Sequence, residues 1–268
     1  MKFPRSVDIA VKPVALTPDE SPLQGSAERS LALCALVAEE GRPITLAEMS
    51  AKLALPKGTV HRLCATLLAT GYLARDIDER MFTVGPALRR LAFNSLNHAT
   101  LRGLRHEVLS ELVSQIGETC NFTTLDGTEV LYLDRVEARR PLRLTIDIGE
   151  HVPLHCTSSG KLLLAHMPKR RRDDLIRRMD LPRLTPATLT TGEELRAECD
   201  DILKRGYSKD REEFVPGLIS VAVPVKDPQG TVRATLSVHA PVARMPMEIA
   251  EKQLDRLKAA GRRMSTLI

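Results

Sequence analysis

The stretch from Ile44 to Gly85 constrains the fold more than any other part of the chain. It predicts two short amphipathic helices joined by a tight turn, followed by two strand-like runs, 72–75 and 81–84, around a polar turn at 76–80. Thr45 and Glu48 have the spacing of a capping box at the start of the first helix. This order of elements is typical of a winged helix-turn-helix, which places its second helix in the major groove of DNA.

The second of these helices is predicted from about Pro56 to Thr70, and Gly71 ends it. At about 100° per residue, four apolar residues share one side and are expected to face a core: Val60, Leu63, Cys64 and Leu67. The opposite side is expected to meet DNA, with Arg62 reading a base edge and Lys57 binding phosphate. A charged face in solvent is the alternative for both. With the wing included, the predicted DNA-contacting residues are Lys57, Gly58, Thr59, His61, Arg62, Thr66, Arg75 and Arg80.

The local distribution of charge supports a DNA-binding surface better than the net charge of the chain does. The chain carries a formal net charge of +5, which permits nucleic-acid binding without proving it. Residues 1–98 contain 12 Lys and Arg against 10 Asp and Glu, so the excess is not concentrated there. Between Glu48 and Asp76, however, there is no acidic residue and there are four basic ones. A surface that meets phosphate has this character.

Cysteine usage and hydropathy indicate the compartment. The five cysteines are scattered without a CxxC pair, so neither a zinc site nor a disulfide framework is expected, and a reducing cytoplasm fits best. The first 25 residues lack the apolar core of a signal peptide. No run of about 18 apolar residues occurs, so no membrane span is expected. No cofactor is expected either.

Four parts are predicted along the chain: a disordered tail at 1–25, a winged helix-turn-helix domain at 26–85, a linker helix within 86–100, and an effector-binding and oligomerisation domain at 101–268. Ser26 is expected to cap the first helix, which runs to about Glu39. The linker helix is predicted at 87–97, with a boundary near 98–100. The last part is predicted to be α+β. Its helices are expected at 101–116, 157–166, 169–179, 192–205 and 246–265, and its strands at 121–125, 130–135, 207–210, 219–226 and 231–239.

Six motifs in this order give the chain a resemblance to a known family. They are LPKGTVHRL at 55–63, LDRVE at 133–137, PLHCTSSGK at 153–161, RLTPATLT at 183–190, GYSKDREEFVPG at 206–217 and VAVPV at 221–225. The chain resembles the IclR family of bacterial transcriptional regulators over about residues 26–266. The resemblance implies a C-terminal effector domain of GAF-like topology, with a mixed or antiparallel sheet flanked by helices. It also implies homodimers or homotetramers on a palindromic or repeated DNA operator, controlled by a small carboxylate or aromatic acid.

The resemblance also implies an effector site. The positions carried over by motif are Ser158, Ser159, Asp210, Ser220, Ser237 and His239. Several members have Cys in place of Ser220 and Gly-Ala in place of Ser158-Ser159, so the ligand cannot be copied from one relative. Serine at position 220 favours an aromatic acid.

The residues themselves suggest how such a site works, with plainer alternatives open. A helix that begins near Ser158 and Ser159 would present free N–H groups to an anion, although the serines could simply cap that helix. Asp210 lies in a charged run that could be a solvated face. Because a bound carboxylate would repel Asp210 unless one of the two is protonated, we expect Asp210 to bind the other end of the ligand. Ser237 and His239 point to one face of a strand, in a pocket or in an ordinary core.

Two other classes of function remain as alternatives: an enzyme, or a DNA-binding protein without a ligand. His155 and Cys156 are adjacent, but neighbours on an extended segment point to opposite faces and do not form a catalytic pair. No phosphate-binding loop, HExxH or GxSxG motif occurs. The missing catalytic residues argue against an enzyme, and the long C-terminal half argues against a simple DNA binder.

Overall fold

The computed structural model describes residues 25–76, 80–96, 99–140 and 146–267. The chain forms two compact units, Met1–Arg89 and Arg90–Ile268. The division falls inside helix α4 (Pro86–Leu96), the predicted linker, and thus before the boundary expected near 98–100. The predicted tail at 1–25 lies, except for Gly25, outside the described residues. Among those residues, no helix combines the length and apolarity needed to cross a membrane.

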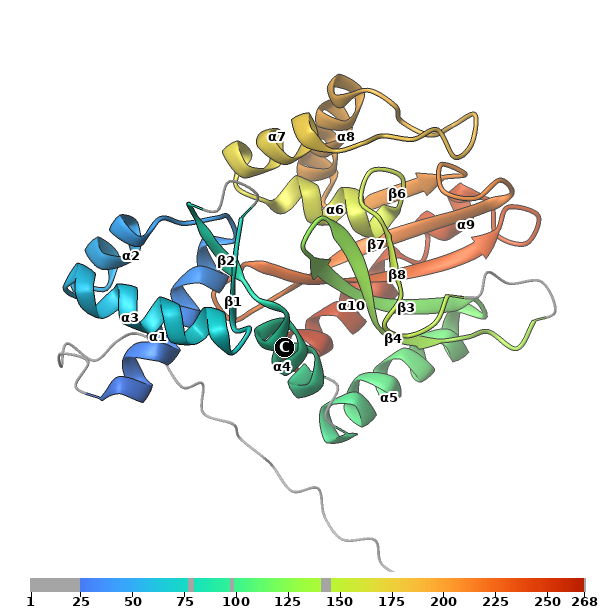
Figure 1. The fold of residues 1–268 in the computed structure, drawn as a ribbon. Helices are drawn as coiled ribbons and strands as arrows, with labels where there is room; N and C mark the ends of the chain where they lie inside the picture. The colour runs from blue at the N-terminus through green and yellow to red at the C-terminus, as the bar shows by residue number, and fades with distance from the viewer. Residues whose placement is uncertain (1–24, 77–79, 97–98, 141–145, 268) are drawn as a thin grey trace, which may run out of the picture. The chain divides into compact units, whose positions relative to one another are not determined.

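The first unit is a three-helix core with a short hairpin (Figure 1). Its elements are α1 (Ser26–Glu40), α2 (Leu46–Lys52), α3 (Lys57–Ala69), β1 (Leu73–Arg75) and β2 (Phe82–Val84). The hairpin is antiparallel, and Ile44 adds a bridge to Phe82. The capping box of α2 is confirmed, because Thr45 accepts the N–H of Glu48 and the Glu48 carboxylate accepts the N–H of Thr45. Order and pairing are those of a winged helix-turn-helix.

Sequence periodicity located the core of this unit correctly. The α3 residues predicted to face inward are all buried, together with Leu33, Val37, Ile44 and Met49. Gly85 allows the chain to pass close to the hairpin, because a Cβ there would lie 2.2 Å from the Gly71 carbonyl oxygen. The predicted N-cap of α1 was wrong: Gly25 is the extended cap residue, its N–H donates to Glu28, and Ser26 already lies in the helix.

The second unit is a six-stranded, fully antiparallel sheet with helices on both faces (Figure 1). The strand order is β5-β4-β3-β8-β7-β6. The strands are β3 (Thr119–Asp126), β4 (Glu129–Val136), β5 (His151–Pro153), β6 (Ser208–Arg211), β7 (Leu218–Lys226) and β8 (Val232–Pro241). The helices are α5 (Ala99–Ile116), α6 (Ser158–His166), α7 (Lys169–Arg178), α8 (Gly192–Arg205), α9 (Met247–Glu251) and α10 (Leu254–Met264), followed by a 3₁₀ turn at Ser265–Leu267.

Two apolar clusters lie on opposite faces of this sheet. Helices α5 and α10 cover one face, where Phe122, Leu133 and Leu236 are fully or almost fully buried. Helix α6 covers the other face and packs in turn against α8. The chain is therefore α+β, as predicted, and the face beneath α6 is the one that carries the predicted effector residues.

Two elements of this unit differ from the sequence expectation. The closing helix, predicted as one piece over 246–265, is divided into α9 and α10 at Lys252 and Gln253. The N–H of Gln253 bonds to the carbonyl of Ala250, a three-residue step that interrupts the helical ladder. Strand β5 was not predicted, because a three-residue strand has too few positions to show alternation and is defined by its pairing with β4.

Candidate DNA-binding and effector-binding sites

One face of α3 is exposed and basic. Lys57, His61 and Arg62 are exposed, and within the described ranges their side chains have no ion-pair partner. The neighbouring basic residues are paired with carboxylates: Lys52 with Glu40 at 2.5 Å and Arg42 with Glu48 at 2.8 Å. Lys52, which contributes to the basic run in the sequence, is therefore largely neutralised. The uncompensated positive charge of this region lies on α3 itself.

The other predicted DNA-contacting residues surround this face. Gly58 and Thr66 are exposed, Thr59 is half-buried, and the Thr66 hydroxyl donates to the Arg62 carbonyl at 3.2 Å. Arg75 is exposed and lies 5.0 Å from the centre of the Phe82 ring. Arg80 is exposed, but most of the predicted wing tip, 77–79, lies outside the described residues.

The N-terminus of α6 is built by the CTSSGK segment. Thr157 is the N-cap: its hydroxyl accepts the N–H of Gly160 and donates to the carbonyl of Pro153. The alternative that Ser158 and Ser159 only cap the helix is therefore wrong. Gly160 allows the helix to approach the sheet edge, because a Cβ there would lie 2.3 Å from the Leu154 carbonyl oxygen. The N–H groups of the two serines belong to the first turn, which has no helical acceptors.

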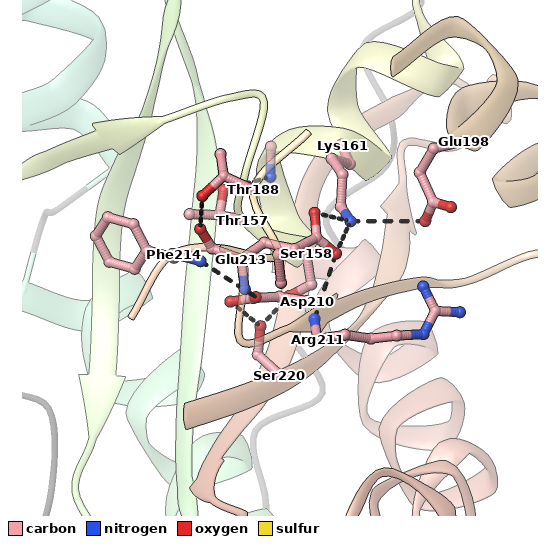
Figure 2. A network of polar contacts seen from close by, with 12 residues as sticks. Thr157, Ser158, Lys161, Thr188, Glu198, Asp210, Arg211, Glu213, Phe214 and Ser220 are labelled. Atoms are coloured by element: carbon pink, nitrogen blue, oxygen red, sulfur yellow. Dashed lines mark hydrogen bonds and ion pairs between the residues drawn. The ribbon is translucent and has the colours of Figure 1, made fainter. Parts of the chain in front are cut away.

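Three of the predicted effector residues meet at this helix end (Figure 2). The hydroxyls of Ser158 and Ser220 lie 2.6 Å apart, and Ser220 donates to the Asp210 carboxyl at 3.5 Å. All three side chains are at least 95% buried. Asp210 thus lies at the same end of the site as the serines, whereas the sequence hypothesis placed it at the opposite end of the ligand.

Burial changes the chemistry of Asp210. Desolvation, with a smaller contribution from the charge of Glu213, raises the pKa of its carboxyl to about 7. Lys161 and the N–H groups of Glu213 and Phe214 oppose this rise. Near neutral pH a substantial fraction of Asp210 is protonated. In that form its O–H is able to donate a hydrogen bond to an anion, whereas the ionised carboxylate would repel one.

A buried ion pair, missed in the sequence, holds this cluster together. Lys161 is fully buried on α6, and its ammonium lies 2.5 Å from both carboxylate oxygens of Glu213 and 3.6 Å from Glu198 (Figure 2). The hydroxyls of Thr185 and Thr188 donate to the Glu213 carbonyl. The lysine of CTSSGK and the second glutamate of KDREE therefore fix the segment that carries Asp210. The charged run 209–213 is not simply a solvated face.

Strand register sets the positions of the other predicted effector residues on the sheet. Ser220 on β7 lies directly opposite His239 on β8 and, on its other side, opposite Asp210 on β6. Desolvation, with a smaller effect of the Arg135 charge, lowers the pKa of His239 to about 3, so this ring is neutral. Ser237 is buried two residues along β8, on the same face. Ser159 is buried at the N-terminal end of α6, and within the described residues its side chain makes no hydrogen bond to the other five.

His155 and Cys156 do not form a nucleophilic pair. Desolvation raises the pKa of the buried Cys156 thiol to about 12, and the Nε2 atom of His155 lies 3.1 Å from the Pro182 carbonyl oxygen. In the described part of the chain, no group of three His, Cys, Asp or Glu side chains is placed to hold a metal ion.

Two family models match the chain. The IclR helix-turn-helix domain matches residues 26–76, and the C-terminal domain of bacterial transcriptional regulators of the IclR type matches residues 93–266. The probable transcriptional regulator SauR of Cupriavidus necator is 39% identical over 223 residues, which cover 83% of this chain and 88% of that protein. The transcriptional repressor IclR of Escherichia coli is 28% identical over 236 residues, 87% of this chain and 86% of the repressor.

Solved structures agree with this assignment. The crystal structure of Thermotoga maritima IclR has a TM-score of 0.60 and 25% identity, covering 90% of this chain and 97% of that one. An IclR homologue from Microbacterium hydrocarbonoxydans, complexed with 4-hydroxybenzoate, has a TM-score of 0.58 and 26% identity. The match covers 89% of this chain and 98% of the homologue. With its winged helix-turn-helix and its C-terminal effector domain, the chain belongs to the IclR family of bacterial transcriptional regulators.

Proposed function

We propose that this regulator binds its operator in the cytoplasm through α3 and the wing, and that a small carboxylate, most favourably an aromatic acid, controls that binding. The proposed DNA-contacting residues are Lys57, Gly58, Thr59, His61, Arg62, Thr66, Arg75 and Arg80. Residues 26–85 would form the DNA-binding domain, 86–100 the linker, and 101–268 the effector and oligomerisation domain. A homodimer or homotetramer would present two recognition helices to a palindromic or repeated operator.

The observation that carries the effector proposal is the cluster of Ser158, Ser220 and Asp210 at the N-terminus of α6. Two hydroxyls, a carboxyl that is partly protonated near pH 7 and free first-turn N–H groups offer several donors to one anion. Ser159, Ser237 and His239 complete the proposed site. The bound 4-hydroxybenzoate of the Microbacterium hydrocarbonoxydans homologue supports an aromatic acid as the ligand class.

The test begins with an operator selected from random duplex DNA by the purified protein. Fluorescence anisotropy then measures its affinity with and without a panel of aliphatic and aromatic acids. We expect at least one acid to change operator affinity about 5–150-fold, the range of typical coupling energies. Arg62→Ala should weaken binding to the selected operator by about 1–3 kcal/mol and relax its sequence preference, without lowering the Tm. Arg170→Ala, an exposed arginine on α7, is the matched control and should change nothing.

The outcomes separate the alternatives. If the wild-type protein enriches no sequence from random duplex DNA, the DNA-binding proposal is wrong. Binding that no acid alters, even for acids that raise the Tm, would favour a ligand-independent DNA-binding protein instead.

A further inference from the structure

A row of five paired residues crosses five strands of the effector domain on the face that α6 covers, and four of the five are polar. Asn121 on β3 lies directly between Arg135 on β4 and Ser237 on β8. Ser237 lies opposite Ala222 on β7, which lies opposite Ser208 on β6. Direct partners in an antiparallel ladder point to the same face. The row therefore runs beside Ser220 and Asp210, one pleat along the sheet.

Several of these groups are buried without hydrogen bonds. Asn121 is fully buried, and neither its Nδ2 nor its Oδ1 atom has a partner among the described residues. The same holds for the hydroxyls of Ser237 and Ser208, which are 1% and 0% exposed. A buried amide without a partner is costly, and native proteins contain few such groups.

The neighbouring row shows that this sheet satisfies polar groups elsewhere. Thr123 and Thr235 lie on the same two strands and the same face as Asn121 and Ser237, and their hydroxyls are 2.7 Å apart. On β3 and β8, the unsatisfied groups of this face thus lie in the row that borders the Ser158–Ser220–Asp210 cluster. A bound molecule would supply the missing partners.

We propose that Asn121 is an effector-binding residue that, with Ser237, holds the end of the ligand opposite to its carboxylate. The ligand then carries a hydroxyl or amide at that end. This inference rests on the proposed effector function. An amide that offers both donors and an acceptor fits a neutral group of this kind, and Asn121 has no counterpart among the residues that the family resemblance supplied.

Strand geometry sets the size of this ligand. Asn121 lies two strands and two residues away from Ser220, which corresponds to about 12 Å between their Cα atoms. Both side chains stand roughly perpendicular to the sheet, so their polar atoms are separated by a similar distance. Hydrogen bonds of about 2.9 Å at each end then leave roughly 6 Å between the polar ends of the ligand. A benzoic acid with a polar para substituent has this span.

The first test needs no ligand. Asn121→Leu replaces two unsatisfied polar atoms by apolar ones of similar volume, so we expect the Tm of the effector-free protein to rise. Asn121→Ala serves as a second variant in case leucine does not pack. A purely structural asparagine would behave in the opposite way, and a lower Tm in both variants would overturn the proposal.

The second test compares benzoic acids that differ in the polarity of the para substituent. Thermal shift and calorimetry are carried out with 4-hydroxybenzoate and 4-carbamoylbenzoate against 4-methylbenzoate and benzoate. We expect the two polar-substituted acids to bind the wild type about 10-fold more tightly, as loss of one buried hydrogen-bond pairing implies, and this preference to vanish in Asn121→Leu. The double variant Thr123→Val/Thr235→Val is the matched control and should keep the preference.

Three results would overturn the inference: a preference that survives in Asn121→Leu, equal binding of all four acids, or no binding of any. None of them removes the proposed function, because operator release by a different acid would still show an effector-controlled regulator.

Discussion

At the scale of single residues, burial changes the acid–base behaviour of Asp210. In an unfolded chain its pKa is near 3.8, and burial raises it to about 7 in the folded protein. Between these values the folded state binds more protons than the unfolded state, so Asp210 makes stability fall as pH rises from about 4 to about 7. Above that range a buried negative charge persists beside Glu213, and the N–H groups of Glu213 and Phe214 compensate it only in part.

Asp210→Asn should therefore raise the Tm of the effector-free protein at pH 8 and change it little at pH 4.5. The amide keeps the shape of the side chain and removes the charge. Thermal denaturation from pH 4.5 to 8 measures this difference. Asp227→Asn is the control of opposite sign, because hydrogen bonds and Arg233 lower the pKa of Asp227. A Tm difference for Asp210→Asn that is the same at every pH would show that Asp210 is not desolvated as described.

At the scale of elements, α6 and the segment after β6 form one unit through Lys161 and Glu213. The pair is buried, and removing one partner leaves an uncompensated charge, which typically costs about 3–5 kcal/mol. Lys161→Met should lower the stability of the effector domain by that order, and Lys161→Met/Glu213→Leu should lower it less than the sum of the single changes. Urea denaturation followed by circular dichroism measures all three. Additive losses would mean that the two side chains do not interact.

The two faces of α3 allow a second prediction at this scale. Lys57→Ala should weaken binding to all DNA sequences alike and reduce the salt dependence of log K by about one unit. Arg62→Ala should cost about 1–3 kcal/mol on the selected operator and relax its sequence preference, because a bidentate base contact is lost. Anisotropy titrations at several salt concentrations, on selected and random DNA, separate the two effects. Equal loss on both DNAs for Arg62→Ala would reassign that residue to phosphate binding.

Which elements could be predicted from sequence depends on how local their signals are. The capping box at Thr45 and the spacing of buried residues on α3 involve neighbours in the chain, and both were confirmed. The Lys161–Glu213 pair joins residues 52 positions apart, and nothing local marks either residue as buried. Asn121 was not singled out for the same reason: its neighbours come from the two partner strands β4 and β8. Motif resemblance supplied Ser158, Ser220 and Asp210, and the structure brings these three together.

At the scale of the whole molecule, operator binding and effector binding must be thermodynamically coupled if the effector controls transcription. Linkage requires that an acid which lowers operator affinity binds more weakly to the operator complex by the same factor. Each ligand's affinity therefore reports on the other site. The protonation state of Asp210 should affect this coupling, because the carboxylate of the proposed effector binds beside Asp210.

At a fixed effector concentration below saturation, the effector-induced change in operator affinity should therefore weaken as pH rises from 6 to 8. Protonated Asp210 donates a hydrogen bond to the carboxylate, and ionised Asp210 repels it, so effector affinity falls through the pKa of about 7. Asp210→Asn retains a donor at every pH and should make effector affinity nearly independent of pH over this range. Calorimetric titration of wild type and variant at pH 6, 7 and 8, paired with operator anisotropy, tests both steps. The same pH slope in Asp210→Asn would assign the titration to another group, and His239 is not a candidate because its pKa is lowered to about 3.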